Sequence, residues 1–267
     1  MRYKIDHDYH IHSHLSLCSK DAEQTTQRML QYAKNLGLSK ICITDHYWDS
    51  SVEGASNWYK KQDFDHISAS LPLPKADGID FLFGAETDMD RFMTVGVSKK
   101  GFDDFDFVII PTTHLHMTGF TLTNEEQEDI GAKARLWVSR FETLLSMDLP
   151  FGKIGIAHLA CSLMHKASRE GYITLLDTIP QSELERVFSK AAERGVGIEL
   201  NRDDMAFADS EADSVLRIFR AAKACGCKFY LGSDAHSPSE LESSKEYFDR
   251  AIDLLDLKES DKFHIAR

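Results

Sequence analysis

Histidines and acidic residues repeatedly follow short apolar runs in this sequence. Imidazole nitrogens and carboxylate oxygens are ligands that suit Zn²⁺, Fe and Mn²⁺. Two or three divalent ions in one pocket would lower the pKa of a bound water and let it attack an ester. The side chains that could contribute to such a site are His10, His12, His46, Glu86, His114, His116, His158, Asp234 and His236.

Spacing within two of these motifs adds a geometric constraint. Side chains two residues apart on a β-strand point to the same side, so His10 and His12 can bind one ion together. Asp234 and His236 have the same spacing. A lone histidine is more often a surface residue or a hydrogen-bonded core residue, and we interpret the other histidines in that way: His7, His14, His66, His165 and His264.

Short apolar runs, each typical of a β-strand, lead into these motifs and alternate with helical patterns. This alternation predicts one α/β domain with a parallel sheet. In a parallel barrel the carboxyl ends of all strands meet on one face, so motifs far apart in sequence would share a pocket. The predicted strands are 3–12, 40–44, 81–85, 107–110, 153–157, 196–200 and 228–232.

The connections between these strands carry helix signals. Apolar residues recur at helical spacing over 27–36, before Gly37, and the segments after Ser182 and Ser210 have the Ser-x-x-acidic spacing of a capping box. Two connections are longer, 47–79 and 117–150, and we expect them to be insertions on the ligand side that shape the mouth of the pocket.

Composition restricts the partners. The chain of 267 residues has a formal net charge of −12, which argues against a long nucleic acid and favours a small substrate. The sequence has no apolar run long enough for a membrane span, and its opening residues do not resemble a signal peptide, so we expect a cytoplasmic protein without a membrane partner. Its five scattered cysteines indicate reduced thiols.

These motifs, in this order, resemble the PHP (polymerase and histidinol phosphatase) family of metal-dependent phosphoesterases over about residues 6–240. The resemblance implies a distorted (β/α)₇ TIM-like barrel for a single domain, 1–267. It also implies that His10, His12, Glu86 and Asp234 bind a first metal. Glu86 would bridge to a second metal bound by His114 and His158, and a third would lie between His46 and His236.

One position departs from the family pattern. Where relatives complete the third site with His or Asp, this chain has Cys18, whose thiolate would favour zinc over manganese. Asp21, three residues further on, is an alternative ligand, and the third site could also be weak or empty.

The substrate side of the site is less constrained by the motifs. His116 competes with His114 as the ligand after the fourth strand, or could bind substrate together with Asn201 and Arg202. The leading hypothesis is hydrolysis of a small phosphomonoester, similar to histidinol phosphate, by a metal-bridged hydroxide. A phosphodiesterase or exonuclease acting on short single strands, and a non-hydrolytic metal-binding scaffold or sensor, are the alternatives.

Overall fold

Seven parallel β-strands form the centre of the protein in the computed structural model, which describes residues 1–266. Each strand pairs with the next one along the chain, in the order β1 to β7. The strands are β1 (His7–Ile11), β2 (Lys40–Ile43), β3 (Asp80–Glu86), β4 (Phe107–Ile109), β5 (Ile154–Ile156), β6 (Gly197–Asn201) and β7 (Lys228–Gly232). All seven predicted strands are confirmed, although β1 begins four residues later than expected.

The sheet curls until β7 meets β1, which makes a nearly closed barrel. Near the carboxyl ends of these strands, the Asp234 N–H donates to the His10 carbonyl at 2.7 Å and the His12 N–H donates to the Ala235 carbonyl at 3.1 Å. Nearer the amino-terminal end of β1, the Leu231 N–H on β7 instead donates to Nε2 of His7 at 3.1 Å. A side chain thus replaces a backbone partner between two strands, and the predicted distorted TIM-like barrel is confirmed.

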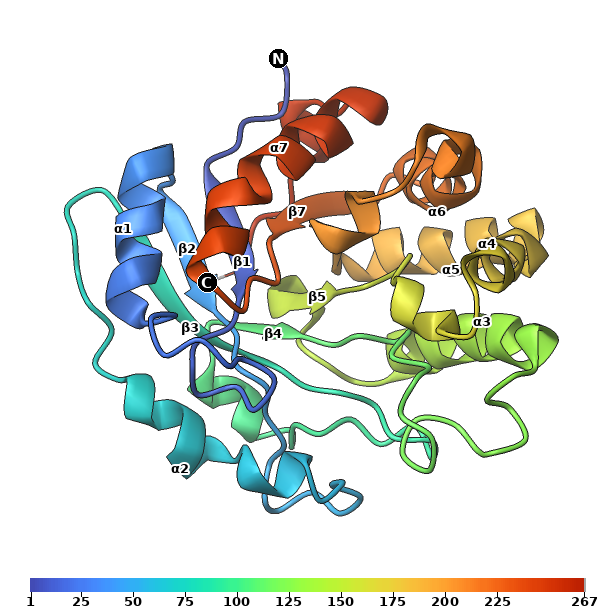
Figure 1. The fold of residues 1–267 in the computed structure, drawn as a ribbon, viewed down its shortest axis with the longest axis horizontal. Coiled ribbons are helices and arrows are strands. Elements are labelled where there is room, and N and C mark those ends of the chain that lie inside the picture. Colours follow the sequence, from blue (N-terminus) through green and yellow to red (C-terminus); the bar gives the residue numbers. More distant parts are fainter. Residues whose placement is uncertain (267) are drawn as a thin grey trace.

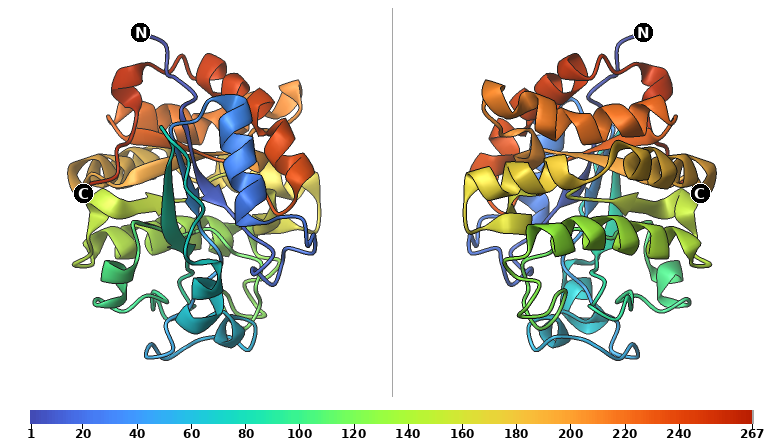
Figure 2. Two further views of the ribbon diagram at one scale, coloured as in Figure 1. Left: turned by 90° about the vertical axis from the view of Figure 1, so that its left-hand side faces the viewer. Right: turned by 90° about the vertical axis from the view of Figure 1, so that its right-hand side faces the viewer.

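Helices surround the barrel and cover the outer faces of its strands (Figures 1 and 2). Their apolar faces pack with the outward side chains of the sheet into one large core. The helices are α1 (Thr26–Leu36), α2 (Phe64–Ile67), α3 (Ile130–Ser146), α4 (Arg169–Thr178), α5 (Gln181–Arg194), α6 (Ala212–Ala224) and α7 (Pro238–Leu254). None of the described helices is both long and apolar enough to cross a membrane.

Aromatic side chains fill the inside of the barrel. Tyr9, Phe107 and Tyr230 pack together there, with ring centroids 5.2 to 6.2 Å apart. Gly155 on β5 makes room for them, because a Cβ at that position would lie 2.5 Å from the Tyr230 hydroxyl. Since the interior is packed, polar side chains can gather only at the ends of the strands.

Two local predictions about helix starts are wrong. Helix α5 begins at Gln181 after Pro180, so Ser182 lies inside the first turn and does not cap it. Helix α6 begins at Ala212, and the Glu211 carboxylate that precedes it accepts a hydrogen bond from the Ala208 N–H at 2.9 Å. In contrast, α1 ends at Gly37 in a left-handed conformation, as the sequence predicts.

The two long connections differ in kind. Residues 47–79 contain the short helix α2 and lie to one side of the barrel (Figure 1). Residues 117–150 contain α3, the helix that connects β4 to β5 and packs against α4 and α5. Only the part of this second segment that precedes α3 is therefore an excursion beyond the regular strand-helix pattern.

Candidate metal centre

Glu86, the last residue of β3, lies at the centre of the histidine motifs. Its Oε2 is 3.1 Å from Nε2 of His12 and 3.2 Å from Nδ1 of His46, and its Oε1 is 3.4 Å from Nε2 of His158. Both oxygens are buried and accept no hydrogen bond from the described residues. One carboxylate is therefore shared among histidines from three strand ends.

The first group of possible ligands consists of His10, His12, Glu86 and Asp234. Nε2 of His10 and Nε2 of His12 are 3.0 Å apart, and Oδ1 of Asp234 is 3.3 Å and 3.1 Å from them. Ligands in a tetrahedron around zinc, each about 2.0 to 2.1 Å from the ion, would be roughly 3.3 Å apart. The group has the dimensions of one zinc site.

Hydrogen bonds behind these two histidines fix which ring nitrogen carries the proton. Nδ1 of His10 lies 2.6 Å from a Glu199 carboxylate oxygen, so it donates there. Nδ1 of His12 lies 2.9 Å from Oγ of Ser16, which itself donates to Asp45 at 2.7 Å and must therefore accept from His12. Both Nε2 atoms thus face each other and two carboxylates, an arrangement that a cation between them, a proton or a metal ion, stabilises.

The second group consists of Glu86, His114 and His158. Nδ1 of His114 donates to Asp88 at 3.0 Å, and Asp88 also accepts from the Tyr59 hydroxyl at 2.8 Å, so Nε2 of His114 is free to bind an ion. His158 has a φ of 61°, a left-handed conformation that is unfavourable for a residue with a side chain.

The third group consists of His12, His46 and His236, with nitrogens close enough to bind one ion. Sγ of Cys18 lies 3.0 Å from Nε2 of His236 and borders the same cavity. Asp21 does not line that cavity, and its Oδ1 instead accepts from the Glu23 N–H at 2.9 Å. The geometry thus favours Cys18 over Asp21. By distance His12 lies in this group, but its Nδ1 faces Ser16 and its Nε2 belongs to the first group.

The residues present fit divalent metal ions. Their ligand atoms are imidazole nitrogens and carboxylate oxygens, a set that suits zinc and its neighbours among the transition metals. Burial disfavours ionisation of Glu86, but positive charge at the surrounding histidines holds its pKa well below the usual value, so the site favours a charged carboxylate beside a cation. A buried carboxylate whose two oxygens accept no hydrogen bond is stabilised by a cation beside each oxygen.

The three expected substrate contacts have different positions. His116 borders the cavity outside the metal groups, and burial together with His114 lowers its pKa to about 2, so it is neutral. Arg202 also borders the cavity. Asn201 is fully buried and does not, because its amide donates to Glu199 at 3.2 Å and accepts from the Asp203 N–H at 2.8 Å. Asn201 therefore supports Glu199, and the expected substrate contact is corrected.

Several residues behind the histidines were not among the expected site residues: Ser16, Asp45, Asp88 and Glu199. Asp88 lies two residues after Glu86. The same two-residue spacing that relates His10 to His12 could have predicted that Asp88 lies near the site. Ser16 offered no such signal, because it acts through a loop contact that no strand periodicity predicts.

A cavity of about 670 Å³ opens above these groups. Glu86, His114, His158 and Asp234 lie at its base, and apolar side chains form part of its wall: Trp58, Tyr59, Met117, Phe120 and Leu163. The connections that follow β2 and β4 supply most of this apolar wall, as expected for segments that shape the mouth of the pocket.

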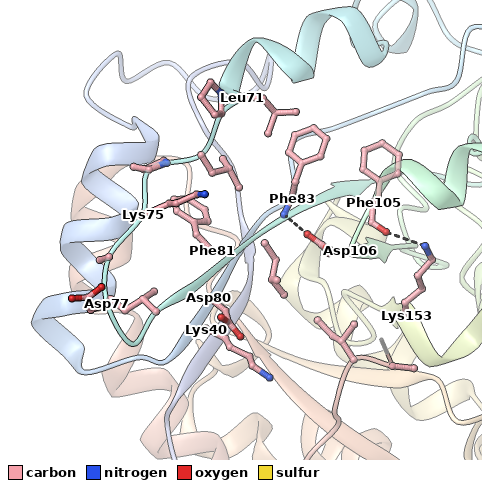
Figure 3. Close-up of a pocket in the computed structure, with 18 of the residues that line it drawn as sticks. Lys40, Leu71, Lys75, Asp77, Asp80, Phe81, Phe83, Phe105, Asp106 and Lys153 are labelled. Carbon is pink, nitrogen blue, oxygen red and sulfur yellow. Dashed lines mark hydrogen bonds between the residues drawn. The ribbon is translucent and has the colours of Figure 1, made fainter.

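A larger cavity of about 1020 Å³ lies at the opposite, amino-terminal end of β2 to β5 (Figure 3). Two of its charged side chains already have hydrogen-bond partners: Asp106 accepts from the Phe83 N–H at 3.0 Å, and Lys153 donates to the Phe105 carbonyl at 2.9 Å. None of the described residues that line it belongs to a possible metal group. The possible metal groups therefore lie at the smaller cavity and not at this one.

Comparison with known proteins agrees with this geometry. A family model for the PHP domain matches residues 8–203, and the chain belongs to that family. It is 28% identical over 238 residues to a "Probable histidinol-phosphatase" from Deinococcus radiodurans, covering 86% of each chain.

Solved structures share the fold. A histidinol phosphate phosphatase from Lactococcus lactis, crystallised with zinc, L-histidinol and phosphate, aligns with a TM-score of 0.59 at 18% identity, covering 97% of this chain and 94% of that one. A proposed histidinol phosphatase from Listeria monocytogenes also gives a TM-score of 0.59, at 12% identity over 91% of this chain and 99% of that one.

Proposed function

We propose that this protein is a metal-dependent phosphomonoesterase that hydrolyses a small phosphorylated metabolite similar to histidinol phosphate. The observation that carries the proposal is the group of four possible ligands formed by His10, His12, Glu86 and Asp234. Two imidazole Nε2 atoms 3.0 Å apart, flanked by the Glu86 and Asp234 carboxylates, would be stabilised by a cation between them. Relatives named as histidinol phosphatases support the substrate class.

Under this proposal the three groups bind three ions, of which two form the reaction centre. The first is bound by His10, His12, Glu86 and Asp234, and the second by Glu86, His114 and His158. The third is bound by His46 and His236 together with Cys18. Zinc is the metal that this mixed imidazole, carboxylate and thiol set suits best.

When bound, divalent ions supply Lewis acidity, which acidifies water and withdraws charge from phosphoryl oxygens. The protein contributes positioning. Glu199 and Asp88 hold the rings of His10 and His114, and the buried strand ends keep the donors at fixed separations. Arg202, only 7% exposed at the cavity wall, would donate to a phosphate oxygen.

Apolar side chains around the cavity favour a small organic leaving group over a long polymer. Trp58, Phe120 and Leu163 border a space of about 670 Å³, within the range of roughly 300 to 1000 Å³ that small-molecule sites occupy. The net charge of −12 disfavours a long polyanion, while a single phosphate would be neutralised locally by the ions.

The test combines metal quantification with a phosphorylated-metabolite panel. We expect at least two tightly bound divalent ions per chain and release of phosphate from a small monoester. His10→Ala should lose both the metal binding and the phosphate release. His264→Ala, which alters a histidine outside every metal group, should retain both.

Two results would contradict the proposal. Much faster cleavage of a bis-aryl phosphate than of a mono-aryl phosphate would indicate a phosphodiesterase. Fewer than one bound ion per chain, with no hydrolysis after addition of Zn²⁺ or Mn²⁺, would indicate a non-catalytic domain.

A further inference from the structure

Asp204 is a buried acidic residue on the cavity wall that the proposed metal groups do not use. It lies just after β6 and is only 3% exposed. Its Oδ2 accepts from the Ala160 N–H at 3.1 Å, whereas its Oδ1 accepts no hydrogen bond from the described residues. A buried carboxylate oxygen without a partner is energetically unfavourable, so such a group requires an explanation.

The wall around Asp204 has more negative than positive charge. Arg202 is the only lysine or arginine among the described residues that line the cavity. Its guanidinium is already paired, at 2.8 Å with Asp203 and at 3.3 Å with Glu240. Asp204 therefore has no lysine or arginine partner on this wall, and burial, only partly offset by His158, raises its pKa to about 7.

The position of Asp204 relates it to the reaction centre. The hydrogen bond that Asp204 accepts comes from the N–H of Ala160, two residues after His158 of the second metal group. If the phosphate is bound by the ions proposed at Glu86 and His158, the rest of the substrate lies in the same cavity, whose wall includes Cys161, Leu163 and Asp204.

We propose that Asp204 is a specificity-determining residue that binds a positively charged group of the substrate, an ammonium or a protonated heterocycle attached to the phosphate ester. This inference rests on the proposed phosphatase function and narrows its substrate class to cationic phosphomonoesters. A charged hydrogen bond in such a buried position strengthens binding by about 10-fold to 100-fold.

The experiment uses the zinc-loaded full-length protein and two matched series of ligands. Binding of ω-aminoalkylphosphonates with two to five carbons is compared, by calorimetry, with binding of alkylphosphonates of equal length. The hydrolysis of the corresponding phosphate esters is measured as kcat/KM. We expect the amino compound of the best length to bind at least about 10-fold more tightly than its neutral counterpart and to react correspondingly faster.

The decisive variant is Asp204→Asn, which keeps the shape of the side chain and removes its charge. We expect the ratio between amino and neutral ligands to fall to near one, while affinity for the neutral ligands and the zinc content stay unchanged. Asp209→Asn is the matched control, because Asp209 lies on the same connection with a fully exposed side chain and should leave the ratio as it is.

Three outcomes overturn the inference. The first is no preference for the amino series in the unmodified protein, and the second is a preference that persists in Asp204→Asn. The third is an equal loss for both series, which would assign Asp204 to supporting His158 or to protonating the leaving group. Because phosphonate binding is measured without turnover, an intact charge preference with no hydrolysis would reject the proposed phosphatase function and keep the assignment of Asp204.

Discussion

The carboxylate of Glu199 lies 2.6 Å from Nδ1 of His10, deep at the carboxyl end of the barrel. The other oxygen of Glu199 accepts from the His158 backbone N–H at 3.1 Å. One side chain on β6 therefore fixes the ring of a histidine from the first metal group and the backbone of a histidine from the second. It couples the two groups without being a ligand of the proposed ions.

Replacing Glu199 with Gln should weaken metal binding without unfolding the protein. The amide keeps the size of the side chain but does not hold the His10 proton as strongly, so we expect metal affinity to fall by about 10-fold to 100-fold. Competition with a chromophoric chelator measures this. Glu185→Gln, at an exposed position on α5, is the control, and equal affinities for the two variants would contradict the role given to Glu199.

Gly232 should tolerate no side chain. A Cβ there would lie 2.1 Å from Oε1 of Glu199 and 2.8 Å from Cβ of His10, so Gly232→Ala would force the two apart. We expect a loss of about 1 to 3 kcal/mol in the free energy of unfolding, from overpacking, together with weaker metal binding.

Urea denaturation of the metal-free protein and chelator competition measure the two effects of Gly232→Ala separately. Gly131→Ala is the matched control, since a Cβ there meets only flexible side chains, at 3.3 Å. Native-like metal affinity in Gly232→Ala would show that the contact between Glu199 and His10 does not position the site.

Cys18 should give a spectroscopic signature if it is a ligand. Its Sγ lies 3.0 Å from Nε2 of His236, so an ion bound by His236 is within reach of the sulfur. After replacement of the native metal with Co²⁺, we expect a near-ultraviolet band from charge transfer between thiolate and cobalt. The band should disappear in Cys18→Ser and persist in Cys225→Ser, and its absence from the unmodified protein would exclude a sulfur ligand.

His7 should make the folded state sensitive to acid. Its Nε2 accepts from the Leu231 N–H at 3.1 Å and its Nδ1 donates to Asp6 at 2.8 Å, so the neutral ring fits and the doubly protonated ring does not. Burial lowers the pKa of His7 below the value of about 6.5 that it has in the unfolded chain. The unfolded state therefore binds the proton first as the pH falls.

The consequence for stability has a definite sign. The contribution of His7 is complete above about pH 6.5 and is lost below it, with a slope of up to about 1.4 kcal/mol per pH unit. In His7→Gln this slope should be absent, although the variant is less stable at every pH. Urea denaturation of both metal-free proteins at pH 7.5 and 5.5 measures the difference, and parallel pH profiles would contradict the prediction.

Much of this protein follows from its sequence. The strands and their metal-capable ends were predictable because apolar runs and two-residue spacing are local properties of the chain. His10, His12, Glu86 and Asp234 converge simply because parallel strands end on one face. The end of α1 at Gly37 was equally predictable, because glycine favours the left-handed conformation that ends a helix.

The tertiary structure decided what depends on distant neighbours. It favoured Cys18 over Asp21, placed Asn201 beneath Glu199 and left Asp204 without a partner. Ser182 is not a cap because the helix begins two residues earlier, with Pro180 as its N-cap. Spacing along a strand determines which way a side chain points. Which atom it meets depends on barrel closure and loop packing, where residues far apart in sequence come within hydrogen-bonding distance.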